Sequence, residues 1–224
     1  MHVRDLMQFL AELAEDNRRA WFVMNQPRYD ILRGEFLALV TQLIADISKF
    51  DPAVAGCNPK KALFRINRDL RFGHNKNPYK THFSAAISAT GLKKPSQGGG
   101  PVYYFQIDER GRLVVAAGEY LPPPDRLRAI RQQVIADADG FTRVLKDRKL
   151  KAAFGALQEE DKLLRPPKGF EADAPHMEYL KLRSFMVWKE IDFKAKIPDD
   201  LGRDLASEFR NVLPLVRWLR TVGA

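Results

Sequence analysis

Apolar residues recur at helical spacing near the N-terminus of the chain. Asp5 is placed to cap a first helix, and a short helical turn around Trp21 follows it. Pro27 suits the first turn of a longer helix, which Asp51 and Pro52 should end. The apolar positions of the first helix are Leu6, Phe9, Leu10 and Leu13. This spacing predicts helices that turn one face toward a core.

The middle of the chain changes to short runs of aromatic and β-branched residues, bounded by Gly, Pro and Asn. Such runs predict five strands, at residues 62–66, 81–89, 102–107, 113–120 and 184–191. The Asp-Glu-Arg-Gly loop between the third and fourth runs is short and ends in glycine, which favours a hairpin. The sheet should therefore be mostly antiparallel.

Helical patterns return after the first four of these strands. Pro124, the last of three prolines, suits the first turn of a helix, and Asp139 is placed to cap another. A final helix is expected from Asp199 onward, with a kink at Pro214. The chain is therefore predicted to form a single α+β domain over residues 1–224. Its mostly antiparallel sheet of about five strands would be covered by N-terminal and C-terminal helices.

Composition limits the class of protein. The 224 residues carry a formal net charge of +9, which gives the protein some attraction for polyanions without conferring specificity. Cys57 is the sole cysteine, so an intrachain disulfide is excluded. The N-terminal residues include charged positions every few residues and contain no apolar run of signal-peptide or membrane-span length. We therefore expect a cytoplasmic protein without a membrane partner.

Motifs with a known mechanism are missing from the sequence. There is no P-loop, dinucleotide-binding glycine fingerprint, HExxH motif, EF-hand loop or nucleophile elbow. The histidines, which lie at metal-ligand spacing from no Cys, Asp or Glu, are His2, His74, His82 and His176. We therefore expect no metal site and no cofactor.

The segment from Lys60 to Phe83 carries the strongest chemical signal. Seven Lys or Arg and two His are interleaved there with aromatic residues around a single acid, Asp69. Alternation along the strands would place Arg65, Lys80 and His82 on one shared face, with Tyr79 and Phe83 on the opposite face. The predicted ligand-binding residues are Arg65, Arg68, Arg71, Lys76 and Lys80. His82 and Tyr79 are the candidate proton-transfer residues.

Five longer segments occur in order and resemble one family. They are WFVMNQPRY (21–29), LFRINRDLRF (63–72), NPYKTHF (77–83), GEYLPPP (118–124) and RPPKGF (165–170). Together they are similar to a mainly bacterial family catalogued as domain of unknown function 2461. The resemblance covers nearly the whole chain and implies a single full-length domain, with no activity, cofactor or catalytic residue to carry over.

Three hypotheses for the basic segment follow. In an enzyme without a metal, the Arg and Lys side chains would hold a phosphate or carboxylate of a small ligand while His82 or Tyr79 moves a proton. In a binding module, the same groups would bind an acidic protein or, weakly and without specificity, a nucleic-acid backbone. In a structural network, the arginines would instead pair with acids such as Asp69, Glu35, Asp46 or Glu119. The sequence does not choose among them and gives no oligomeric state.

Overall fold

The N-terminal third of the chain is helical. The computed structural model describes residues 1–71, 76–94, 97–193 and 197–223, and the features below refer to these. The elements up to the sheet are α1 (Val3–Glu15), α2 (Arg19–Met24), α3 (Gln26–Ser48), the 3-10 turn η1 (Pro52–Val54) and α4 (Pro59–Ala62). The predicted helices are confirmed, but Asp5 as a cap is wrong. The helix begins at Val3 and Asp5 lies in its first turn.

The sheet is antiparallel, as predicted from the hairpin loop. Its strands are β1 (His82–Ser88), β2 (Val102–Asp108), β3 (Arg112–Glu119) and β4 (Phe185–Asp192), in the spatial order β1-β2-β3-β4. Gly111 ends the β2–β3 turn with a φ of 77°, a conformation that glycine adopts without strain. The fold class, α+β with an antiparallel sheet, is confirmed.

The predicted strand at 62–66 is wrong. In the described part of the chain, the sheet has four strands instead of the five expected. Asn58 caps the short helix α4 by accepting a hydrogen bond from Lys61 N, and Pro59 begins that helix. The extended chain that follows meets β1 and the residues before it only at two isolated bridges, Leu63–Ala85 and Asn67–Tyr79. Between the two bridges, the stretch from Tyr79 to Ala85 is two residues longer than the stretch from Leu63 to Asn67. The two stretches therefore cannot pair residue by residue as a regular ladder.

Helices return after β3, as expected. They are α5 (Pro124–Ala136), α6 (Ala138–Leu145), α7 (Arg148–Phe154), α8 (Met177–Leu180), α9 (Leu201–Asn211) and α10 (Leu213–Arg220). Pro124 begins α5 as predicted. Asp139 as a cap is wrong, because Asp137 accepts the hydrogen bond from Gly140 N. Pro214 lies in the first turn of α10, so the chain breaks between α9 and α10 rather than kinking within one helix.

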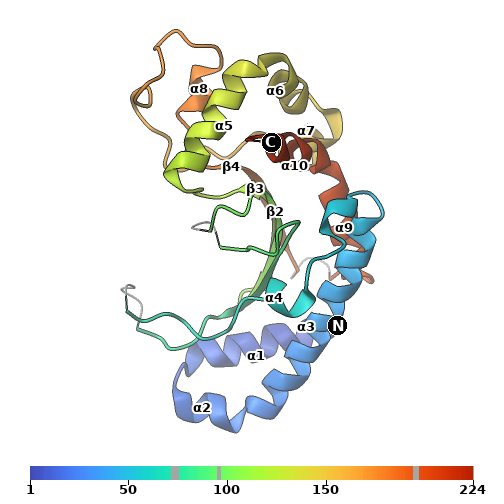
Figure 1. Ribbon diagram of the computed structural model, residues 1–224. Helices are drawn as coiled ribbons and strands as arrows, with labels where there is room; N and C mark the ends of the chain where they lie inside the picture. The colour runs from blue at the N-terminus through green and yellow to red at the C-terminus, as the bar shows by residue number, and fades with distance from the viewer. Residues whose placement is uncertain (72–75, 95–96, 194–196, 224) are drawn as a thin grey trace.

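The sheet is curved and its two faces differ. Figure 1 shows α3, α9 and α10 on the convex side, while the concave side lies open between the arms of a C. The face toward the helices carries fully buried residues such as Phe105, Tyr103, Val115 and Ile87. The buried apolar side chains form one cluster, apart from Ala86 and Ala116 on the other face of the sheet. The division into domains stays a prediction. In the described residues, no helix combines the length and the apolar character that a bilayer crossing requires.

A buried polar triad joins the sheet to the helices. Asp51, at the end of the α3 region, is 2% exposed and receives a hydrogen bond of 2.8 Å from the Tyr103 hydroxyl on β2. Arg220 of α10 binds both carboxylate oxygens, at 2.6 and 2.8 Å. Burial by itself would raise the pKa of Asp51, but the hydrogen bonds from Arg220 and Tyr103 outweigh it and hold the pKa below its usual value. The triad therefore fixes β2 against the C-terminal helix.

Breaking this triad should destabilise the fold. We expect Arg220→Met to lower the free energy of unfolding by about 3–5 kcal/mol, because it leaves the Asp51 carboxylate buried without its cation. Urea unfolding at pH 7 measures the loss. Arg217→Met is the matched control, since Arg217 is exposed on the same helix and donates only to the Phe50 carbonyl. Because the pKa of Asp51 is lowered on folding, the difference from wild type should shrink as the pH falls below about 4. Equal effects of the two substitutions would contradict the structural role of the triad.

Candidate ligand site on the open face of the sheet

The open face of the sheet carries the alternate side chains of all four strands. Strand pairing places Ala86, Tyr104, Ala116 and Trp188 in one row across β1, β2, β3 and β4. The next row consists of Ser88, Val102, Gly118 and Met186. These rows make an apolar surface in which small and large side chains alternate.

A hollow of about 420 Å³ lies on this surface. The volume falls within the range of roughly 300–1,000 Å³ that small-molecule sites occupy. Phe64 and Lys93 line it beyond β1, where Phe64 N donates to the Ser84 carbonyl. Gln158, Glu160 and Asp161 line it beyond β4, where Gln158 N donates to the Met186 carbonyl. The hollow therefore runs across the sheet, with a basic end and an acidic end.

Gly118 on β3 adds no side chain to the floor of the hollow. Gly118 has a φ of 123°, and a Cβ atom there would lie 2.2 Å from the Phe185 carbonyl oxygen. No side chain fits at this position without moving β4. The neighbouring floor position on β3 is Ala116, so this strand lines the hollow with small residues.

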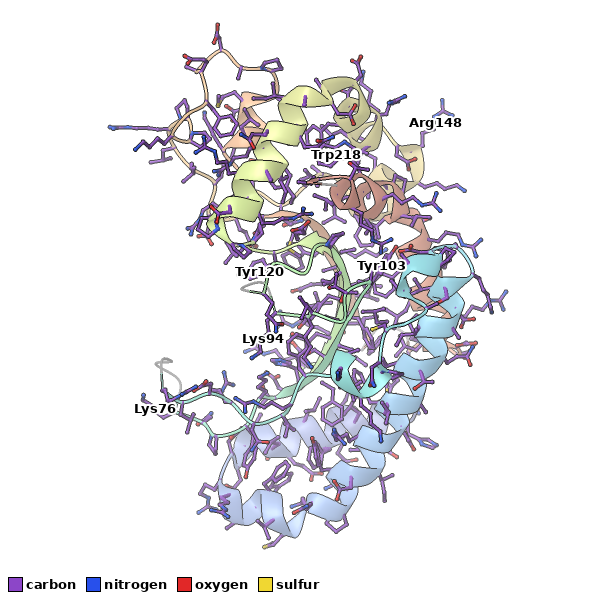
Figure 2. All side chains as sticks on the ribbon, viewed as in Figure 1. Lys76, Lys94, Tyr103, Tyr120, Arg148 and Trp218 are labelled. Atoms are coloured by element: carbon purple, nitrogen blue, oxygen red, sulfur yellow. The ribbon has the colours of Figure 1, made fainter. Side chains whose placement is uncertain are left out.

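A strained turn lies at the edge of the hollow. Leu121 has a φ of 38°, which is unusual for a residue with a branched side chain. Its backbone N–H donates to the Ser184 hydroxyl at 2.9 Å, which ties the turn to β4. Tyr120, the preceding residue, is 50% exposed and lines the hollow. Figure 2 shows Tyr120 and Lys94 on the open side of the C, with Lys76 on the lower arm.

Lys93 lines the basic end, and Lys80, Arg65 and Arg68 lie next to it; we call these four residues the cation cluster. The ammonium nitrogens of Lys80 and Lys93 lie 5.4 and 4.9 Å from the centre of the Phe64 ring. Burial lowers the pKa of Lys80, and the charges of Arg65 and Arg68 lower it further. Burial likewise lowers the pKa of Lys93, with a further contribution from Lys80. The convergence of Arg65 with Lys80 was predicted; Lys93 was missed.

Of the four acids proposed as structural partners of the arginines, one pairs with a predicted arginine and three are bound elsewhere. Asp69 pairs with Arg71 at 2.9 Å, Glu35 with His2, Asp46 with Lys49, and Glu119 with Arg126. Across the described ranges, no carboxylate lies within ion-pair distance of a member of the cation cluster. A local ion pair thus accounts for Arg71. Arg65 is near enough to Asp69 to lower the pKa of that carboxyl, but no member of the cluster has an ion pair of its own among the described residues.

The remaining predicted residues lie in different surroundings. Tyr79 is buried, its ring stacks on Phe22 at 4.1 Å, and its backbone N–H and carbonyl both bond to Asn17. Its face assignment with Phe83 is correct, since both rings are in the core. Lys76 is exposed and donates to the Leu70 carbonyl at 3.4 Å. Phe72 and His74, which also belong to the basic segment, lie outside the described residues.

His82 lies at the start of β1 beside the cluster. Burial lowers its pKa, Lys80 and Arg68 lower it further, and together they bring it to about 4. The imidazole is therefore neutral at pH 7 and adds no charge to the cluster. Near neutral pH the ring can accept a hydrogen bond, but its low pKa makes it a weak proton acceptor.

Residues on other strands complete the site, and the sequence analysis did not select them. Tyr104, Trp188 and Met186 contribute to the hollow from β2 and β4. Their strands show the alternation of half-buried and buried positions that marks one open face. The signal was present in the sequence, but alternation alone does not say which of two apolar faces the helices cover.

Comparison with family models matches residues 5–218 to the model described as conserved hypothetical protein, DUF2461. The match spans all four strands, the hollow and the cation cluster. It confirms the resemblance drawn from the sequence motifs. Comparisons with curated proteins and with solved structures return no match.

The depressed pKa of His82 can be measured directly. We expect its imidazole to titrate near pH 4 in NMR spectra of the folded protein, well below the ordinary value of 6.5. As the pH falls, His82 is protonated in the unfolded chain before it is protonated in the folded protein. Its contribution to the free energy of unfolding is therefore complete above about pH 6.5 and is lost as the pH falls toward 4. His82→Gln should remove this dependence. A midpoint at or above 6.5 would contradict the burial of the ring beside cations.

Proposed function

Since the chain belongs to the family of conserved hypothetical proteins DUF2461, whose description names no activity, we propose a function from its own geometry: the protein binds a small ligand through a phosphate or carboxylate group. The hollow receives the body of the ligand, and the cation cluster receives its charged group. One observation carries this proposal. Lys93 lines one end of an apolar hollow, Lys80, Arg65 and Arg68 lie next to it, and none of the four forms an ion pair with a carboxylate of the described residues.

Electrostatics favours an anion at this end. Lys80 and Lys93 are half-buried; the charges of Arg65 and Arg68 lower the pKa of Lys80, and the charge of Lys80 lowers the pKa of Lys93. Like charges in a partly desolvated place destabilise the fold unless an opposite charge lies near. A phosphate or carboxylate among them would relieve this repulsion and raise both lysine pKa values.

Individual donors in the cluster are free to bind such a group. Arg68 Nε is buried and has no hydrogen-bond partner among the residues that the structure describes. Its guanidinium can form paired hydrogen bonds to a planar or tetrahedral anion. Lys93 Nζ donates to the carbonyls of Lys61 and Leu63, which orients the ammonium and leaves one of its three N–H groups for a ligand.

A small ligand suits the shape of the site better than a nucleic acid does. The cations occupy one end of a bounded hollow rather than a long stripe. At the other end, Glu160 and Asp161 would repel a phosphate backbone that continued across the sheet. We therefore place the polyanion hypothesis second and assign binding, without a reaction, to this site.

Substitution in the cluster should weaken anion binding. We expect wild-type protein to bind inorganic phosphate in isothermal titration calorimetry, more tightly at low than at moderate salt. Arg68→Met should weaken this binding by about 10- to 100-fold, because a charged hydrogen-bond pair contributes about 1.5–3 kcal/mol. Lys80→Met should have a smaller effect in the same direction.

Arg148→Met is the matched control for these substitutions. Arg148 is exposed on α7, and Figure 2 shows it on the side of the molecule away from the hollow. Its loss removes one positive charge but no group of the site, so phosphate affinity should stay within about twofold of wild type. Equal losses in the Arg148 and Arg68 variants would show attraction by net charge alone and would overturn the proposed site.

A further inference from the structure

The two large aromatic side chains of the open face flank a small residue. Tyr104 lies on β2 and Trp188 on β4, and Ala116 on β3 is the direct neighbour of both. Adjacent strands lie about 4.8 Å apart, so the strands carrying the two rings are about 10 Å apart. Side chains stand roughly perpendicular to a sheet, and the alanine fills little of the space between them. The result is a slot with aromatic walls and a floor made by Ala116 and Gly118.

The width of the slot suits one flat ring. Contacting carbon atoms lie about 3.5–4.0 Å apart, so a ring stacked between two others needs about 7–8 Å between their planes. The spacing of β2 and β4 provides this separation when the two rings lean only slightly toward each other. Offset stacking of this kind is the favoured contact between aromatic groups.

We propose that the ligand is a nucleoside phosphate, with its planar base held between Tyr104 and Trp188 over Ala116 and its phosphate held by the cation cluster. This inference rests on the proposed function and adds the chemical class of the ligand. It uses the slot, which anion binding alone does not require.

The distance between the slot and the cluster supports this class. Phe64 lies on the segment beyond β1, and the ammonium groups of Lys80 and Lys93 lie over its ring. Two to three strand spacings therefore separate Ala116 from the basic end, or about 10–14 Å. A simple aromatic acid, whose carboxylate is attached to the ring, is too short to reach both places. A nucleoside phosphate has a ribose between its ring and its phosphate and therefore reaches further toward the cluster, from which the long lysine side chains extend.

The acidic end indicates which bases fit. Gln158, Glu160 and Asp161 line the hollow beyond Trp188, on the side away from the cluster. Carboxylate oxygens only accept hydrogen bonds when ionised, so they suit a base with an exocyclic amino group. We therefore expect adenine, guanine or cytosine nucleotides to bind in preference to uridine nucleotides.

Fluorescence titration of the full chain with adenosine monophosphate tests the inference. Stacking should quench Trp188, and the quenching should disappear in Trp188→Phe, which keeps Trp21 and Trp218. We expect adenosine monophosphate to bind at least tenfold more tightly than inorganic phosphate, because base stacking adds to the contacts of the phosphate. Uridine monophosphate should bind more weakly.

A substitution that fills the slot distinguishes binding of the base from binding of the phosphate, and so tests this inference apart from the proposed function. Ala116→Leu should reduce adenosine monophosphate affinity at least tenfold and leave inorganic phosphate affinity within twofold. Ala152→Leu on the exposed side of α7 is the control, and thermal unfolding verifies that both variants fold. Should Ala116→Leu fail to fold, Tyr104→Leu serves in its place with the same expected result.

Other outcomes would overturn the inference in distinct ways. Adenosine monophosphate binding no more tightly than phosphate, with phosphate binding intact, would remove the nucleoside and leave the anion site. Displacement of the nucleotide by laurate at lower concentrations would assign the hollow to an acyl chain. A single-stranded oligoadenylate that binds more than tenfold more tightly than the mononucleotide would point to a nucleic acid. Failure of both phosphate and nucleotide to bind would overturn the proposed function itself.

Discussion

Period-two alternation along one antiparallel sheet is the constraint on which the rest of the structure depends. Each residue that turns toward α3, α9 and α10 leaves its neighbours on the open face. The large side chains that fill the core, such as Phe105 and Tyr103, thereby fix the register of Tyr104 between them. A shift of one residue would bury Trp188 and expose the core, so packing on one side sets the shape of the hollow on the other.

Cations in the core are paired with acids of the chain, whereas the cations beside the hollow are not. Where a cation supports the fold, the chain supplies its acid: Arg220 binds Asp51, and Arg126 binds Glu119 at 2.6 Å while capping the end of α10. The cation cluster has no such acid within the described residues, although Lys80 and Lys93 are half-buried. This contrast is the physical reason to look for its counter-ion outside the chain.

Local signals were strong enough to predict most of the fold, and the failures have local causes. Prolines and apolar spacing predicted α3 and α5, and the loop ending in Gly111 predicted the hairpin. The strand at 62–66 failed because α4 includes Ala62 and the extended residues after it form only isolated bridges with unequal spacing. In the site, alternation predicted that Arg65, Lys80 and His82 would converge. Trp188 joins the open face through the pairing of β3 with β4, and Lys93 reaches the cluster from a loop whose contacts are with Lys61, Leu63 and Phe64; no local pattern encodes either.

The most direct test of the account is a crystal structure of the full chain grown with adenosine monophosphate. We predict density for the phosphate within hydrogen-bond distance of Arg68 and Lys80, and density for the base between Tyr104 and Trp188 over Ala116. A structure in which acids of the chain close the cation cluster, or in which the nucleotide lies away from the open face of the sheet, would contradict the account.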